Sequence, residues 1–181
     1  MTGPTLVVVD MQQVFGDPAS PWFTPRFADA EAVIAGMVPA FDHVVFTRFI
    51  APENPDGAWV PYYEQWPFAL VPADDPIYDL VLAFRDTGHP VVTETTFGKW
   101  GPALREALDG SQDVVLAGVS TDCCVLSTAL GAADAGVRIR VAADACAGLS
   151  DADHQRALDA MALYAPLIEI SDSAAILGGL R

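Results

Sequence analysis

Short apolar runs alternate with longer amphipathic segments along this chain. Six strand-like apolar runs predict strands: residues 5–10, 43–48, 90–94, 113–118, 137–144 and 167–170. The first is an uninterrupted β-branched run, as expected of a strand buried on both faces. Apolar residues at helical spacing predict helices over residues 27–41, 77–87, 102–108, 122–135 and 151–164. Strands that alternate with helices predict an α/β fold, a three-layer α/β/α sandwich around a parallel sheet of five or six strands.

Residues 51–76 break this alternation. The segment holds many of the prolines, and five large aromatic side chains follow one another closely: Trp59, Tyr62, Tyr63, Trp66 and Phe68. Long excursions in compact domains are often functional. Two interpretations stay open, a lid over a small, flat or apolar substrate, or a satellite cluster that forms a subunit contact. As a lid, the segment would bring Trp59 and Tyr63 to the substrate, with Trp100 beside them.

The length of 181 residues suits one domain, residues 1–181, and a hydrophobic content of 52% excludes a disordered chain. The apolar runs are too short to span a bilayer, which takes about 18 residues or more. The first residues, MTGPTLVVVDMQQ, contain no basic segment and no cleavage-like site. We therefore expect a cytoplasmic protein without a membrane partner.

The net charge and the cysteine pattern argue against several kinds of partner and cofactor. Nine basic residues against 24 acidic ones give a net charge of −15, which repels a phosphate backbone and argues against nucleic acid. Three cysteines form no disulfide framework in a chain without a secretion signal. Spaced pairs such as CxxC or HxxxH do not occur, so we expect no metal and no other cofactor.

The ends of the predicted strands carry the polar candidates, because ligands of parallel sheets bind at the carboxyl ends of strands. Asp10 ends the first apolar run, where a carboxylate is unfavourable unless it is paired. It is therefore a turn cap or a catalytic base. Further candidates for substrate contacts are Gln12 and Phe15 after the first strand, Arg48 at the end of the second and Glu94 at the end of the third.

The stretch STDCCV, residues 120–125, follows the fourth predicted strand and begins an Ala-rich helix. Free backbone N–H groups and the helix dipole favour a thiolate in this first turn and can form an oxyanion hole. Cys123 and Cys124 would lie about 100° apart on an α-helix, so only one would face the site. The other would pack as a small hydrophobic side chain.

The three histidines are poorly placed for a Cys–His pair. His43 and His89 precede their strands and belong to the opposite rim of the sheet, whereas His154 lies on a predicted helix. The imidazole of such a pair must reach the thiol. Asp10 is therefore the better candidate for a base acting on a cysteine.

Nearly the whole chain resembles the isochorismatase-like cysteine hydrolases, which include nicotinamidases, N-carbamoylsarcosine amidases, ureidoacrylate hydrolases and isochorismatases. The resemblance rests on VVVDMQQVF near the start, VVLAGVSTDCCVLSTALGAADAG in the middle and VRIRVAADACAG after it. The family pattern GxxTxxCVxxxA matches from Gly118, through Thr121, Cys124, Val125 and Ala129. It implies an isochorismatase-like, Rossmann-like α/β/α fold.

The resemblance also implies roles for individual residues. Cys124, which directly precedes the valine, would be the nucleophile, and Asp10 would be the base and proton shuttle. A cis peptide bond would join Val119 to Ser120. The backbone N–H groups of Ser120 and Cys124 would then be the oxyanion donors.

The chain departs from the family pattern at the third catalytic residue, a lysine at the end of the third strand. Glu94 occupies that position, and a second carboxylate near Asp10 would raise the pKa of the thiol. Lys99, the only lysine of the chain, follows in the loop TTFGKWGP. We hypothesise that Lys99 folds back to supply the cation, with Arg48 as a weaker substitute. The alternative is that Lys99 is an ordinary surface lysine.

A second departure concerns the substrate. Nicotinamidases carry a metal site of the form DxHxxxH after the second strand, where this chain reads TRFIAPENPDG without a histidine. A bound metal and a nicotinamide substrate are therefore disfavoured.

We predict a homo-oligomeric hydrolase that cleaves an amide, carbamoyl or ureido C–N bond of a small molecule through a covalent intermediate. The alternatives are vinyl ether hydrolysis, which needs the Asp but no thiol, and a non-catalytic binding protein on this fold.

Overall fold

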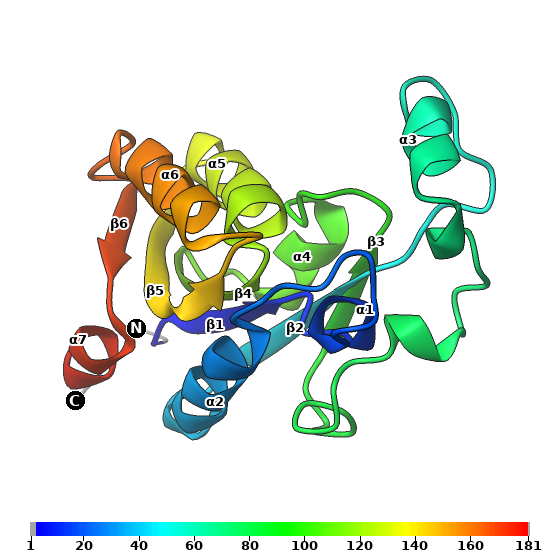
Figure 1. Ribbon diagram of the computed structural model, residues 1–181. Coiled ribbons are helices and arrows are strands. Elements are labelled where there is room, and N and C mark those ends of the chain that lie inside the picture. Colours follow the sequence, from blue (N-terminus) through cyan, green and yellow to red (C-terminus); the bar gives the residue numbers. More distant parts are fainter. Residues whose placement is uncertain (1–2, 181) are drawn as a thin grey trace.

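A computed structural model describes residues 3–180 and contains one six-stranded, all-parallel sheet. Its strands run in the order β3-β2-β1-β4-β5-β6. They are β1 (Thr5–Val9), β2 (Val44–Phe49), β3 (Val91–Glu94), β4 (Asp113–Val119), β5 (Arg138–Ala147) and β6 (Ile168–Ser171). Helices cover both faces of the sheet, which confirms the predicted α/β/α sandwich (Figure 1).

The two faces of the sheet are covered by different helices. They are α2 (Phe27–Met37) and α7 (Ser173–Gly178) on one face, and α4 (Pro102–Ala107), α5 (Leu126–Asp134) and α6 (Asp151–Ala162) on the other (Figure 1). Along β1, Leu6 and Val8 pack on the α2 side, whereas Val7 and Val9 pack on the α5 side. Because successive side chains of a strand point to opposite faces, a strand covered on both faces is apolar throughout.

The strand order changes direction between β1 and β4. The chain runs from β1 outward to β2 and β3, and then returns to the other side of β1 for β4. Gly118, near the end of β4, has φ 119°, and a Cβ atom there would lie 2.1 Å from the Val9 carbonyl oxygen. Only glycine fits this close approach. The residues that follow β1 and β4, Asp10 and Ser120, are thereby brought to the same point at the edge of the sheet.

The segment after β2 forms a small unit of its own. It contains α3 (Trp59–Gln65), followed by a short 3₁₀ turn (Pro67–Ala69), and Figure 1 shows α3 set apart from the helices that cover the sheet. Tyr63 and Tyr78 are buried in a separate apolar cluster. The Tyr78 hydroxyl donates to the Ala69 carbonyl and accepts from the Ala51 N–H. The segment is therefore anchored at its base to the end of β2.

The helix predicted over residues 77–87 does not form, and that prediction was wrong. A 3₁₀ turn (Pro76–Tyr78) is followed by irregular turns. The Val81 N–H donates to the Met11 carbonyl (2.9 Å), and the Asp79 carbonyl accepts from the Gln13 N–H (2.9 Å). Leu80 forms an antiparallel bridge with Gln12. These long-range bonds use the backbone groups that a helix would need.

Other elements differ from the expectation at their ends. The first long helix stops at Met37 and continues as a 3₁₀ turn (Val38–Ala40), which contains a proline. The helix expected over residues 122–135 begins with a π-helical turn (Thr121–Val125) before α5. The short helices α1 (Gln13–Gly16) and α7 had no clear sequence pattern. No helix among residues 3–180 is both long enough and apolar enough to cross a membrane.

Candidate active site

A buried ion pair lies where β1 ends. Asp10 has φ 51°, in the left-handed region, and its carboxylate turns back toward β2. There Thr47 Oγ1 donates to Asp10 Oδ1 at 2.7 Å, and Lys99 Nζ lies 3.0 Å from Asp10 Oδ2. Both charged side chains have no exposed surface. A carboxylate and an ammonium group without water depend on each other to remain charged.

Lys99 is held in this position by several contacts. Its backbone N–H donates to Thr128 Oγ1 (2.9 Å) on α5, and its Nζ donates to the Thr96 carbonyl (2.6 Å). The Nζ atom also lies 5.2 Å from the centroid of the Phe49 ring. The structure thus places the only lysine beside Asp10, as hypothesised, and not on the surface.

Cys124 adjoins this pair. Its carbonyl accepts from Thr128 Oγ1 (2.7 Å), so Thr128 connects the backbone of Cys124 with that of Lys99. The bond between Val119 and Ser120, which enters this turn, is cis, as the resemblance implied. Burial raises the pKa of the Cys124 thiol well above its ordinary value, the Asp10 carboxylate raises it further, and the Lys99 ammonium opposes both. The thiol is therefore protonated at neutral pH and needs a base before it can attack.

A cavity of about 280 Å³ opens above Cys124; we call it the aromatic cavity. It is lined by Phe15, Pro21, Trp22, Thr24, Phe49, Trp59, Tyr62, Trp66, Phe97, Ser120, Asp122, Cys123, Cys124 and Leu149. The walls come from the loop before α2, the end of β2, α3 and the loop after β3. Of the expected substrate contacts, only Phe15 and Trp59 line it, with Ser120 and Cys124 from the expected oxyanion site.

Cys123 also lines the aromatic cavity, so the expectation that only one cysteine faces it was wrong. The cause is the π-helical turn, in which the Val125 N–H donates to the Ser120 carbonyl (3.1 Å). A wider turn reduces the angle between consecutive side chains below that of an α-helix.

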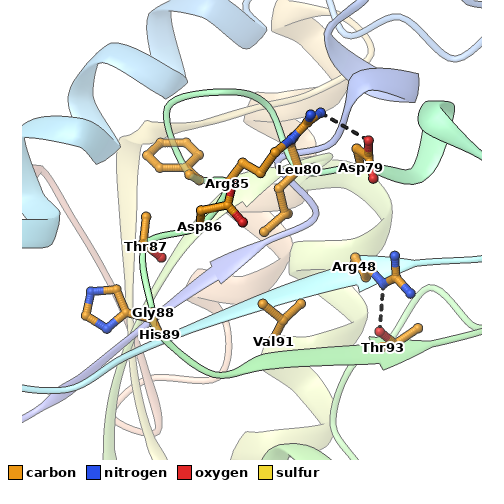
Figure 2. A pocket seen from close by; sticks show the side chains of 11 residues that line it. Arg48, Asp79, Leu80, Arg85, Asp86, Thr87, Gly88, His89, Val91 and Thr93 are labelled. Atoms are coloured by element: carbon orange, nitrogen blue, oxygen red, sulfur yellow. Dashed lines mark hydrogen bonds and ion pairs between the residues drawn. The ribbon is translucent and has the colours of Figure 1, made fainter. Parts of the chain in front are cut away.

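Arg48 points away from the aromatic cavity, which corrects its expected roles as substrate contact and substitute cation. Thr47 faces Asp10, so the next side chain of β2 points to the other face of the sheet. There Arg48 Nε donates to Thr93 Oγ1 at 2.9 Å. Figure 2 shows Arg48 in a second hollow of about 460 Å³, the arginine groove. Its lining is Arg48, Asp79, Leu80, Phe84, Arg85, Asp86, Thr87, Gly88, His89, Val91 and Thr93.

Four other expected substrate contacts also lie outside the aromatic cavity, two of them because their side chains are buried in the interior. The Gln12 amide donates to the carbonyls of Phe49 and Tyr78 and accepts from the Phe49 N–H, so it fastens the loop after β1. Tyr63 is only 2% exposed and packs behind the cavity wall.

The remaining two, Glu94 and Trp100, face other parts of the structure. Glu94 is half-buried at the end of edge strand β3, with its Oε1 beside Gly101. Trp100 packs against Gly131 on α5 and under the Arg105 guanidinium. Neither belongs to the lining of the aromatic cavity.

Comparison with known proteins identifies the family. A model of the isochorismatase domain matches residues 4–172, nearly the whole chain. The chain belongs to the isochorismatase family. Among curated relatives, isochorismatase domain-containing protein 2A of Mus musculus is 37% identical over 113 residues, which cover 61% of this chain and 51% of the relative. Isochorismatase domain-containing protein 2 of Xenopus laevis is 39% identical over 72 residues, 38% and 35% of the two chains. The alignments thus span about half or less of these relatives.

Solved structures share the fold of this family member. A cysteine hydrolase from Pseudomonas syringae pv. phaseolicola superimposes with a TM-score of 0.87 at 19% identity, covering 98% of this chain and 92% of the other. A pyrazinamidase of Pyrococcus horikoshii in complex with zinc gives a TM-score of 0.78 at 23% identity, covering 93% and 98%. In the described part of the present chain, no three His, Cys, Asp or Glu side chains gather in a metal-binding arrangement.

Proposed function

We propose that this member of the isochorismatase-like hydrolase superfamily is a cysteine hydrolase that cleaves a small amide, carbamoyl or ureido C–N bond. The observation that carries the proposal is the fully buried Asp10–Lys99 pair beside a thiol that opens into a cavity. A buried ion pair is weak evidence for stability alone, because apolar residues would fill the space at least as well. Its position next to Cys124 favours a chemical role.

The arrangement supports a ping-pong mechanism. Asp10 takes the proton from Cys124 Sγ, and Lys99 stabilises the thiolate as it forms. The Sγ atom bonds to the carbonyl carbon, while the backbone N–H groups of Ser120 and Cys124 stabilise the oxyanion. When the C–N bond breaks, Asp10 gives its proton to the leaving nitrogen, and a thioester remains.

Deacylation uses the same groups in reverse. Water attacks the thioester carbonyl while Asp10 accepts one of its protons. The C–S bond then breaks, and the thiolate of Cys124 recovers a proton from Asp10. The products are the acid, or its carbamic equivalent, and the free amine or ammonia. Each turnover returns the neutral thiol that the raised pKa favours.

A panel of primary amides, carbamoyl compounds and ureido compounds, each with neutral and cationic members, tests the proposal, and a vinyl ether is assayed beside it. We expect Cys124→Ala to lose at least about 10⁴-fold in kcat for any substrate that the wild type hydrolyses, because a covalent step cannot proceed without the nucleophile. Mass spectrometry of quenched wild-type reactions should show an acyl adduct on the peptide with Cys124. Cys146→Ala is the matched control, since it removes a buried thiol that does not line the aromatic cavity.

Two results would contradict the proposal. If Cys124→Ala retained turnover of a vinyl ether, the Asp-dependent ether hydrolysis known in this superfamily would explain the site better. If the wild type hydrolysed no compound of the panel and formed no adduct, the fold would serve as a binding protein.

A further inference from the structure

The aromatic cavity carries a single formal charge on its walls, and that charge is negative. Asp122 is its only acidic wall residue, and none of the described residues that line it is Lys, Arg or His. The Asp10–Lys99 pair below is neutral as a unit and fully buried. Tyr62 contributes a neutral phenol, because burial raises its pKa to about 12. An anionic substrate would therefore enter without a partner for its charge.

Two neutral groups hold the carboxylate of Asp122 in the cavity lining. Its Oδ1 accepts from the Leu149 N–H (3.0 Å). Its Oδ2 accepts a long hydrogen bond from the Cys123 thiol, at 3.8 Å. Within residues 3–180, no ion pair includes Asp122. A half-buried, unpaired carboxylate in an apolar wall attracts a cation more strongly than one in water does.

Aromatic side chains that line the same cavity as Asp122 pack against one another, and we call them the aromatic wall. Trp22 lies against Tyr62 and Trp66, with centroid distances of 6.2 Å and 6.1 Å. Tyr62 in turn meets Trp59 edge-on at 5.3 Å and Phe97 at 5.9 Å. The negative faces of several such rings attract ammonium groups, quaternary ones above all, since these have little to gain from hydrogen bonds. Phe49, on the cavity floor, already contacts one cation, Lys99.

We propose that the aromatic cavity selects substrates that carry a cationic, apolar-coated group such as a quaternary or tertiary ammonium, with Asp122 and the aromatic wall as the specificity determinants. This inference rests on the proposed function, since it names the substrate class of the same site. A volume of about 280 Å³ limits the whole ligand to a small molecule. The scissile carbonyl would lie over Cys124, and the cationic group would lie in the cavity against the aromatic wall and Asp122.

Equilibrium binding to the Cys124→Ala protein tests the inference without any turnover, so its outcome is independent of the proposed chemistry. Three probes of nearly equal shape differ in charge: choline, 3,3-dimethylbutan-1-ol and 3,3-dimethylbutanoate. The fluorescence of the tryptophans reports binding, because three of the four, Trp22, Trp59 and Trp66, line the cavity. We expect choline to bind at least about tenfold more tightly than the alcohol and the carboxylate to bind most weakly.

Substitutions test whether Asp122 and the aromatic residues cause the preference for choline over the neutral alcohol. Asp122→Asn keeps an Oδ1 acceptor for Leu149, so the fold is preserved while the charge is lost; we expect choline's advantage over the alcohol to fall about three- to tenfold. Trp66→Leu should reduce the same ratio. Asp74→Asn, on the exposed part of the excursion, removes one charge away from the cavity and should change nothing. Equal affinities for choline and the alcohol, or an unchanged ratio in Asp122→Asn, would overturn the inference.

Discussion

The aromatic cavity and the arginine groove begin at consecutive residues of one strand. Phe49 of β2 lines the cavity, whereas Arg48, one residue earlier, lines the groove on the other face of the sheet. The groove is the larger hollow, about 460 Å³ against 280 Å³, and it holds two arginines and a histidine. Its ion pair, Arg85 with Asp79, leaves 42% of each side chain exposed (Figure 2). The pair beneath the cavity, Asp10 with Lys99, exposes none.

The two regions differ in how far water reaches their charges, which matters more here than the size of each hollow or its number of charges. Water screens the charges of the groove, so they affect each other and their neighbours little. The buried pair has no such screening, and both of its members act on the pKa of the adjacent thiol. We therefore assign the proposed chemistry to the desolvated charges and use the groove as a reference for what exposed charges contribute.

Substitutions at the aromatic cavity and in the arginine groove should differ most in their effect on catalytic activity. We expect Lys99→Ala to lower kcat/KM by about 10²–10³-fold or more, because the ammonium that stabilises the thiolate is gone and Asp10 remains buried without a counter-charge. Arg48→Ala, which alters only the groove, should stay within about twofold. Steady-state kinetics on one amide substrate measure both. Unchanged turnover in Lys99→Ala together with its loss in Arg48→Ala would reverse the assignment.

The free energy of unfolding should show the next largest difference, between breaking the buried ion pair and breaking the exposed one. Lys99→Met keeps the shape of the side chain but strands the Asp10 carboxylate, and we expect a loss of about 3–5 kcal/mol in the free energy of unfolding at neutral pH. Arg85→Met, which breaks the half-exposed pair with Asp79, should cost less than about 1 kcal/mol. Urea titrations provide the comparison.

The double variant Asp10→Asn/Lys99→Met sharpens this prediction. It removes both charges, so no carboxylate is left unpaired, and it should recover part of the loss. Equal losses of unfolding free energy in Lys99→Met and Arg85→Met would show that leaving a buried charge unpaired costs no more than breaking an exposed pair.

The sequence predicted the part of this site that follows from strand periodicity and composition. Short apolar runs located all six strands, and strand ends located Asp10 and the turn with Cys124. Lys99 could be predicted although it lies five residues after the family position of the lysine, Glu94, because it is the only lysine of the chain. Thr47, which donates to Asp10, and Thr96 and Thr128, which bind Lys99, carried no signal, because a threonine in a strand, loop or helix is not unusual.

What the sequence did not predict depends on long-range contacts. Residues 79–81 give their backbone hydrogen bonds to the loop after β1, which overrides the helical pattern of residues 77–87. Trp22 lies in an irregular loop, where no periodicity indicates which way a side chain points. The π-helical turn that brings Cys123 into the cavity has two hydrogen bonds shifted to the fifth residue back, from Val125 to Ser120 and from Leu126 to Thr121. Such a shift follows from packing and leaves no spacing pattern to read.

The reactivity of Cys124 itself offers the finest test of the difference between buried and exposed charges. Asp10→Asn is a conservative change, because asparagine tolerates the left-handed φ of 51° and keeps an acceptor for Thr47. It removes a carboxylate that raises the thiol pKa, and the thiolate of Cys124 then becomes the anion that pairs with the Lys99 ammonium. The pKa of Cys124 should therefore fall, and alkylation by iodoacetamide at pH 7 should become faster while amide hydrolysis is lost.

A background of Cys123→Ala and Cys146→Ala leaves Cys124 as the only thiol of the chain, so the rate of alkylation against pH reports its pKa directly. The matched control is Asp79→Asn in the same background. It removes a carboxylate from the arginine groove, where water screens it, and should leave the midpoint of the profile unchanged. A midpoint that stayed constant or rose in Asp10→Asn would mean that the carboxylate does not act on the thiol, and Asp10 would lose its role as the base. A faster alkylation joined to a slower hydrolysis would instead separate two tasks of Asp10, since it restrains the thiol at rest and takes its proton only when a carbonyl is in reach.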